Sequence, residues 1–123
     1  MTDDEAKALG LRAVAWMGWR WLPGMLDGCC VERIFERCDL DGLWVETRYE
    51  QPEVFTLHPG IWPDLRDAAT MGAAIALWQA RPGHDYRCPC PVMTYAAVYG
   101  LTDRRTIVAL VAALEASASV CAS

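Results

Sequence analysis

A cluster of three tryptophans within six residues, followed at once by a Pro-Gly pair, constrains the fold of this chain most. Trp16, Trp19 and Trp21 follow a stretch with helical apolar spacing, and Pro23-Gly24 comes directly after the cluster. Large apolar rings at the end of an amphipathic helix anchor that helix in a core, and Pro-Gly stops it. The cluster therefore predicts a first helix from about 2 to 21 whose C-terminal end is held by tryptophan.

Size and composition indicate one globular domain over residues 1–123. The chain has 54% hydrophobic and 22% charged residues, values typical of a folded chain that buries a single modest core. Apolar stretches are short and interrupted, so the sequence predicts no membrane-spanning segment, and the acidic start is unlike a secretory signal. We therefore expect a cytosolic location. The net charge of −5 argues against direct nucleic-acid binding and allows a basic protein partner instead.

Two further helices are predicted towards the C-terminus. Asp67 is a good N-cap for a helix with Met71, Ile75 and Trp78 on one face, ended by the Arg-Pro-Gly at 81–83. Thr102 or Asp103 caps a last helix with a buried face that includes Ile107 and Leu114. Between these helices, residues 91–99 alternate in the manner of a strand.

The middle of the chain allows two interpretations. Residues 43–50 alternate as a strand after the Asp41-Gly42 turn, and 31–37 pairs with them as a hairpin. The spacing of Val31, Ile34, Phe35 and Cys38 also fits a short helix. A short extended piece is expected at 54–57. The hairpin interpretation predicts an α+β fold with about three helices packed on a small, mainly antiparallel sheet, and an all-helical fold is the alternative.

Metal binding and catalysis have weak support in the sequence. A zinc site would combine Cys88 and Cys90 either with His84 or with Cys29, Cys30 and Cys38. The spacings of one residue and none are not those of a zinc knuckle, so reduced, buried cysteines are expected, with no metal and no cofactor. The Asp39–Gly42 turn fails as a calcium loop because Trp44 occupies the glycine position. His58 and His84 lie in expected loops and no catalytic motif accompanies them, so no enzymatic activity is predicted.

Partner-binding residues are predicted next to the turns. Trp21 and Trp62 lie beside proline-containing turns, where an exposed indole would make a strong contact with another protein. Asp39 and Asp41 contribute acidic groups at the hairpin turn. Trp16 and Trp78, in contrast, are expected in the core.

Three segments resemble a group of uncharacterised phage and prophage proteins. They are Met17–Met25 with its Gly-Trp pair, Pro63–Gly72 with a Pro-Asp-Leu segment and a helix start in which Ala68 replaces the usual proline, and the Ala/Leu/Glu run Val111–Ala116. The resemblance implies a phage-encoded cytosolic protein of a bacterial host, with no transferable active site. The first functional hypothesis is a non-enzymatic accessory protein that binds a host protein, such as a nucleic-acid-binding defence complex inhibited in the anti-CRISPR manner. The alternatives are a homo-oligomeric structural or regulatory phage module and a zinc-stabilised module.

Overall fold

The computed structural model describes residues 1–29, 32–37, 43–46, 52–55, 61–81 and 91–116. Within these ranges the chain forms four helices and a four-stranded antiparallel sheet. The order along the chain is α1 (Asp3–Val14), β1 (Leu26–Asp27), β2 (Glu32–Arg37), β3 (Leu43–Glu46), β4 (Pro52–Phe55), α2 (Ala68–Gln79), α3 (Val92–Tyr99) and α4 (Arg104–Ala116). The fold is α+β, as the sequence predicted.

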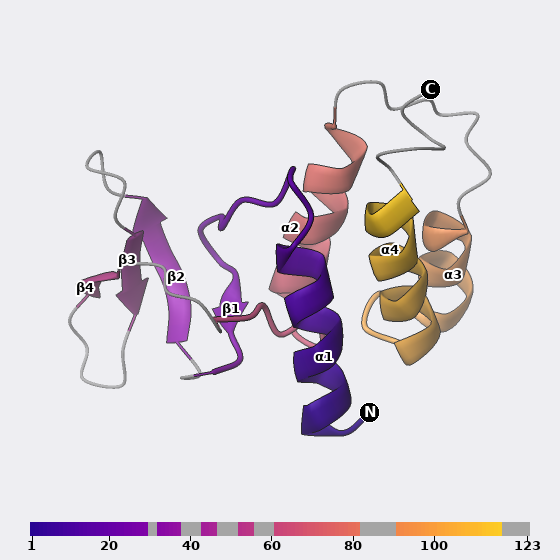
Figure 1. The fold of residues 1–123 in the computed structure, drawn as a ribbon, viewed down its shortest axis with the longest axis horizontal. Helices are drawn as coiled ribbons and strands as arrows, with labels where there is room; N and C mark the ends of the chain where they lie inside the picture. Colours follow the sequence, from indigo (N-terminus) through magenta and orange to yellow (C-terminus); the bar gives the residue numbers. More distant parts are fainter. Residues whose placement is uncertain (30–31, 38–42, 47–51, 56–60, 82–90, 117–123) are drawn as a thin grey trace.

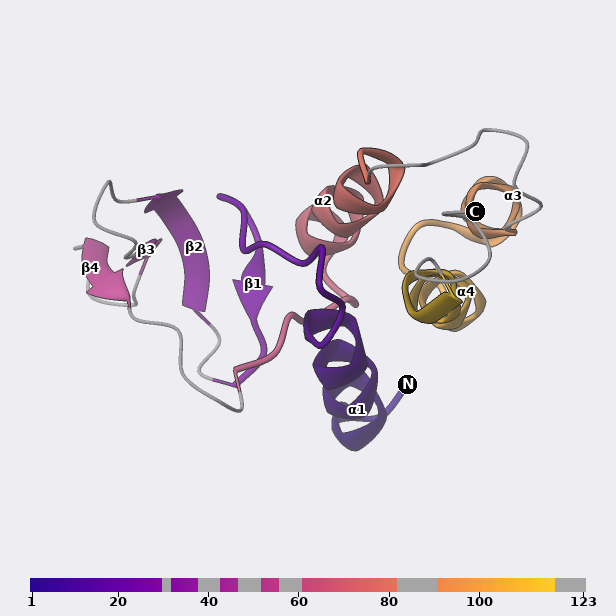
Figure 2. The same ribbon diagram turned by 45° about the horizontal axis from the view of Figure 1, so that its top comes forward.

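The sheet stands beside the helices instead of beneath them. Its strands follow the order β1-β2-β3-β4, and β4 lies farthest from the helices (Figure 1). The helices pack on one another, with α4 against α1, α2 and α3 (Figures 1 and 2). The described residues form four helices where about three were predicted, and the sheet packs against the helical part at α2, through Ile34 of β2 and Leu77.

The hairpin prediction for the middle of the chain is confirmed. β2 pairs antiparallel with β3, with Ile34 opposite Val45 and Arg37 opposite Leu43. β4 joins β3 on the far side and lies slightly before the extended piece expected at 54–57. The alternation of apolar and polar residues over 43–46 was a correct strand signal, because a pleated strand exposes its two faces alternately.

Residues 91–99, predicted as a strand, form α3 instead. This segment packs against α4 in the helical part of the molecule, away from the described strands of 26–55, and a helix satisfies its own backbone hydrogen bonds there (Figure 1). Val92 is fully buried, and Tyr95, one turn later, packs on the same core. Tyr95 and Tyr99 then stack four residues apart, with ring centroids 5.6 Å apart. Helical spacing thus underlies the apparent alternation.

The first helix is shorter than predicted. Thr2 caps α1 by accepting a hydrogen bond from the Glu5 amide at 3.2 Å, as expected, but the helix ends at Val14. The chain then turns, with the Trp19 amide donating to the Trp16 carbonyl at 3.0 Å. The tryptophan cluster therefore lies in the loop after the helix, and the turn at Gly24, with a φ of +96°, leads the chain into β1.

Two connected apolar clusters form the core. The larger lies among the helices and is built from residues such as Met71, Ile107 and Leu110. The smaller joins the sheet to α2, with Ile34 of β2 and Leu77 of α2 packed together with Trp21. Trp78 is 3% exposed, which confirms its predicted place in the core.

A polar junction also ties the sheet to the start of α2. The Asp67 carboxylate accepts hydrogen bonds from the amide and the hydroxyl of Thr70. It also forms a two-point ion pair with Arg33 of β2, in which each guanidinium nitrogen lies 3.0 Å from a carboxylate oxygen. The Leu26 amide of β1 donates to the Thr70 hydroxyl at 2.7 Å. The predicted N-cap Asp67 therefore fixes both the helix start and the position of the sheet.

Candidate functional site

The two tryptophans predicted to contact a partner are buried. Trp21 is 5% exposed and meets Trp19 edge-on, with ring centroids 5.9 Å apart. Trp62 is 6% exposed and lies against Gly10 and Gly28, which have no side chain to displace its ring. The expectation that these indoles are exposed is wrong, because Trp21 packs in the smaller core cluster and Trp62 packs against α1 at Gly10 and against Gly28. Asp39 and Asp41 lie outside the described residues.

Most residues of the proposed zinc and catalytic sets also lie outside the described ranges. They are Cys30, Cys38, Cys88, Cys90, His58 and His84. Cys29 is described, as an exposed free thiol. Across the described ranges, no three His, Cys, Asp or Glu side chains are grouped so that they could hold a metal ion. Metal content of the native protein, measured by mass spectrometry, tests the zinc alternative directly.

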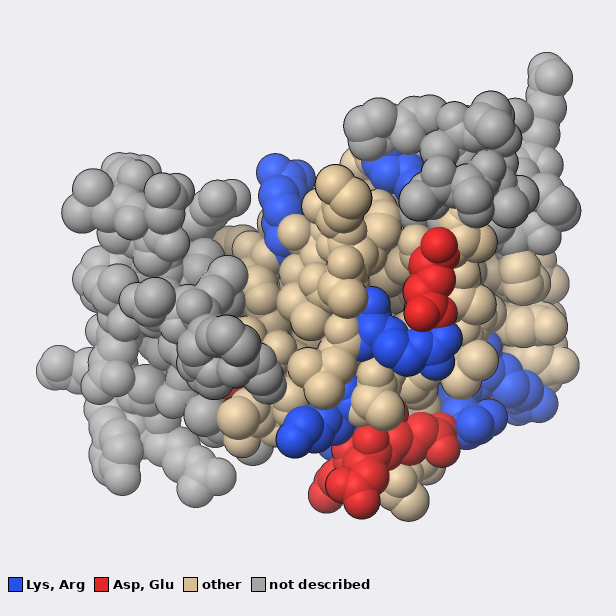
Figure 3. Space-filling model, viewed as in Figure 1, with Lys and Arg blue, Asp and Glu red and all other residues tan. Residues whose placement is uncertain are grey.

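The carboxylates of the helical part are largely paired with arginines. Figure 3 shows acidic and basic side chains next to one another on one face. Arg66 bridges Asp3 and Asp64, at 2.7 and 2.9 Å, and Arg104 pairs with Glu5. These contacts link the ends of α1, α2 and α4, but such exposed pairs add little stability each. A continuous acidic face is therefore not a feature of this part of the surface.

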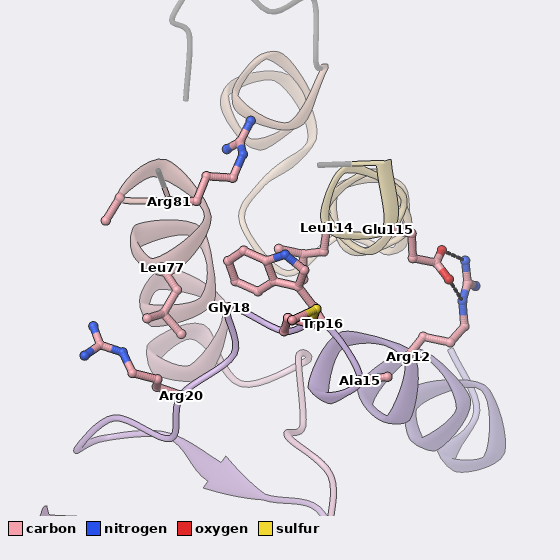
Figure 4. A pocket seen from close by; sticks show the side chains of 11 residues that line it. Arg12, Ala15, Trp16, Gly18, Arg20, Leu77, Arg81, Leu114 and Glu115 are labelled. Atoms are coloured by element: carbon pink, nitrogen blue, oxygen red, sulfur yellow. Dashed lines mark hydrogen bonds and ion pairs between the residues drawn. The ribbon is translucent and has the colours of Figure 1, made fainter. Parts of the chain in front are cut away.

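A cavity among the described residues lies where three helices end. A pocket of about 710 Å³ is lined by residues from the C-terminal ends of α1, α2 and α4 and from the loop after α1 (Figure 4). Its volume is in the range of small-ligand pockets. The lining residues are Arg12, Ala15, Trp16, Met17, Gly18, Arg20, Leu77, Ala80, Arg81, Leu114 and Glu115.

Trp16 forms the centre of the pocket wall. Its indole lies between Leu77 of α2 and Leu114 of α4 (Figure 4) and is half-buried, whereas the sequence predicted it in the core. Gly18 makes this position possible, because a Cβ on Gly18 would lie 2.4 Å from the Trp16 ring. The glycine at position 18 therefore allows the Trp16 ring to form part of the pocket wall.

Arginines surround this apolar wall. On one side of the pocket Arg12 of α1 makes a two-point ion pair with Glu115 of α4, and this hydrogen bonding lowers the pKa of Glu115. On the α2 side lie Arg20 and Arg81 (Figure 4). Arg81 is 7% exposed, donates to the Trp78 carbonyl and lies over the Trp78 ring, with 4.7 Å from Cζ to the centroid.

Met17 completes the site as a fully exposed apolar side chain. Its relative exposure is 101%, the highest among the exposed large apolar residues of the described ranges. It sits at the turn between Trp16 and Gly18, at the rim of the pocket. An exposed methionine beside an apolar hollow is adaptable contact surface for another molecule.

The sequence did not predict this pocket. Arg12, Trp16 and Arg20 lie close together in the chain, but Arg81 of the α2 end and Glu115 of α4 are distant, and only the meeting of the C-terminal ends of α1, α2 and α4 completes the pocket. The available signal was local: Trp16-Met17-Gly18 contains the indole, the exposed methionine and the glycine. This arrangement can bind another molecule through the apolar surface of Trp16 and the arginines around it.

Comparisons with protein families, curated proteins and solved structures found no match to this chain. None of the described helices is long and apolar enough to cross a membrane.

Replacing Gly18 by alanine is expected to displace the Trp16 indole. The added methyl would overlap the far edge of the ring, which can rotate away, so we expect the pocket to change shape with a stability loss of roughly 1 kcal/mol or less. Near-UV circular dichroism and tryptophan fluorescence would show the altered ring environment. An unchanged spectrum would contradict the predicted packing of Trp16 on Gly18.

Proposed function

We propose that this chain is a phage-encoded, non-enzymatic accessory protein that acts in the cytoplasm of a bacterial host by binding a host protein. Its concrete form is an inhibitor of a host defence complex, of the anti-CRISPR type. The resemblance of residues 17–25, 63–72 and 111–116 to phage proteins supports the phage origin. The pocket at the helix ends supports a binding role and carries the proposal.

The contact surface in this proposal is the pocket and its rim. It combines the half-buried Trp16, the fully exposed Met17 and the nearby arginines, and tryptophan and arginine are the side chains most enriched where binding energy concentrates. Trp21 and Trp62, being buried, act by supporting the fold. The pairing of acidic side chains in the helical part favours a contact made through this pocket over one made through an acidic face.

Replacing Met17 by serine is expected to reduce capture of the host protein without changing stability. The side chain is fully exposed, so its truncation removes no core packing, and the unfolding midpoint should stay the same. Capture from host lysate, at low and at high salt, would be compared between the native protein and the variant. We expect at least a several-fold loss of the retained protein.

The matched control is Val98→Ser, which truncates an exposed apolar side chain on α3, a helix that does not line the pocket. This variant should retain the host protein as the native chain does. No retained host protein with the native chain would remove the proposed function. If Met17→Ser retained as much host protein as Val98→Ser, the contact surface would not be at the pocket.

A homo-oligomeric phage module is the second candidate, and α3 favours it. Met93, Val98 and Tyr99 are exposed on this helix, which carries no charged residue. Exposed apolar side chains on one helix suit self-association, although the Arg105 guanidinium covers the Tyr99 ring, with 3.5 Å from Cζ to the centroid. Light scattering at several concentrations separates the candidates, because a monomer at all of them removes the second.

A further inference from the structure

The charge of the pocket is opposite to that of the whole chain. The protein carries −5, yet three of the charged lining residues are arginines, Arg12, Arg20 and Arg81, and one is an acid, Glu115. Arg12 donates two hydrogen bonds to Glu115, so the negative charge of Glu115 is compensated by Arg12. The local field therefore favours an anion, even though the protein as a whole repels one.

The helix ends explain two of these arginines. The last carbonyls of a helix carry partial negative charge, and arginines near them are favourable. Arg81 donates to the Trp78 carbonyl near the end of α2, and Arg12 lies in the last turn of α1. Both are therefore engaged by the fold. Arg20 is different: it is exposed, lies in the loop after α1, and forms no ion pair with any of the described carboxylates.

The apolar wall fixes the other half of the ligand. The Trp16 indole supplies the accessible apolar surface, Leu77 and Leu114 lie buried on either side of it, and Arg20 is on the same side of the pocket as Leu77 (Figure 4). A ligand that satisfied both features would place an apolar group on the indole and a negative group next to Arg20. A cationic ligand would meet arginines on either side.

We propose that the pocket recognises a carboxylate next to an apolar side chain, presented by a segment of the partner protein. The inference rests on the proposed function and names the chemistry of the partner that this pocket accepts. Charge complementarity places the acidic residue of the partner next to Arg20. The apolar surface of Trp16 then accepts a neighbouring leucine-like or phenylalanine-like side chain of the same segment. The partner would thus bind through an acidic and apolar segment.

Three short peptides test this chemistry on the full-length protein. The probe is acetyl-Leu-Glu-Leu-amide, compared with the same peptide carrying glutamine or lysine in the middle. Amide chemical shifts by NMR should move at residues 15–18, 77–80 and 114–115. The glutamate peptide should bind roughly fivefold more tightly than the glutamine peptide, the upper end for a partly exposed ion pair, and the lysine peptide most weakly.

Matched variants locate the preference. Arg20→Gln should abolish the advantage of glutamate over glutamine, whereas Lys7→Gln, which removes the same charge from an exposed site on α1 outside the pocket, should keep it. Equal binding of the glutamate and lysine peptides would overturn the inference. So would a glutamate preference that survives in Arg20→Gln.

Free octanoate distinguishes a second source of the same chemistry. If octanoate shifts the same amides and binds more tightly than the glutamate peptide, the pocket serves a free amphiphile and the protein segment is excluded. Different results would contradict the proposed function and this inference. Capture of a host protein that depends on Met17, without any glutamate preference, would leave the function standing and remove only the inference.

Discussion

Gly10→Ala is expected to destabilise the protein by about 2 kcal/mol, although alanine is the better helix former. Gly10 lies in the middle of α1 and is buried. A Cβ at this position would lie 2.5 Å from the Pro63 carbonyl oxygen and 3.1 Å from the Trp62 ring. The carbonyl belongs to the backbone between the sheet and α2, where Pro63 bridges to Asp27, so it has little freedom to move. The clash should therefore exceed the gain in helix propensity.

Gly72→Ala is the matched control and should act in the opposite direction. Gly72 also lies inside a helix, α2, but it is exposed and a Cβ there meets nothing within 4 Å. Replacing it should stabilise the protein by about 0.5–1 kcal/mol, because alanine loses less backbone entropy on folding. Urea unfolding of both variants gives the two free energies. A stability of Gly10→Ala equal to that of Gly72→Ala would contradict the packing of α1 against Pro63.

Local signals in the sequence were sufficient for elements whose ends and apolar faces are encoded within the element. The Asp67 cap and the apolar face of α2 correctly gave the helix start, and the turn at 41–42 followed by alternation gave the hairpin. They were insufficient at 91–99, because alternation over eight residues of valine, tyrosine and alanine fits either a strand or a helix. The packing of this segment on α4, which depends on the whole fold, decides between them.

The candidate site was less predictable because it depends on contacts between distant segments. Trp21 and Trp62 stand beside similar turns, and their burial follows from Met25, Ile34 and Gly28, which the fold brings against them. The pocket needs the ends of three helices to meet at one end of the helical part, and no single segment indicates this. The close packing of Gly18 against the Trp16 ring, which places the indole at the pocket, likewise becomes visible only in the structure.

The polar junction at Asp67 should contribute more to stability than the exposed ion pairs. Asp67→Ala removes the N-cap of α2 together with the two-point contact to Arg33 and the contact to the Thr70 hydroxyl. We expect a loss of about 2–3 kcal/mol, from a cap worth about 1 kcal/mol and charge-assisted hydrogen bonds to a partly exposed arginine. Asp67→Asn keeps a capping oxygen and loses the charge, so its loss should be nearer 1 kcal/mol.

The pH dependence separates the charge of Asp67 from its capping role. Hydrogen bonding from Arg33, and then from Thr70, lowers the pKa of Asp67 in the folded protein below the ordinary value of 3.8, against the opposing effect of burial. A lowered folded-state pKa means that the carboxylate stabilises the fold above the unfolded-state value, and that this contribution is lost as the pH falls through the folded-state pKa. The free energies of unfolding of the native protein and of Asp67→Asn should therefore differ at pH 7 and converge below pH 3.8. Asp103→Asn makes the same change at the start of α4, where the arginine partner is more exposed (57% for Arg105, 38% for Arg33), so its difference at pH 7 should be smaller. A constant gap for Asp67→Asn down to acid pH would refute the ion pair as the source of its stabilisation.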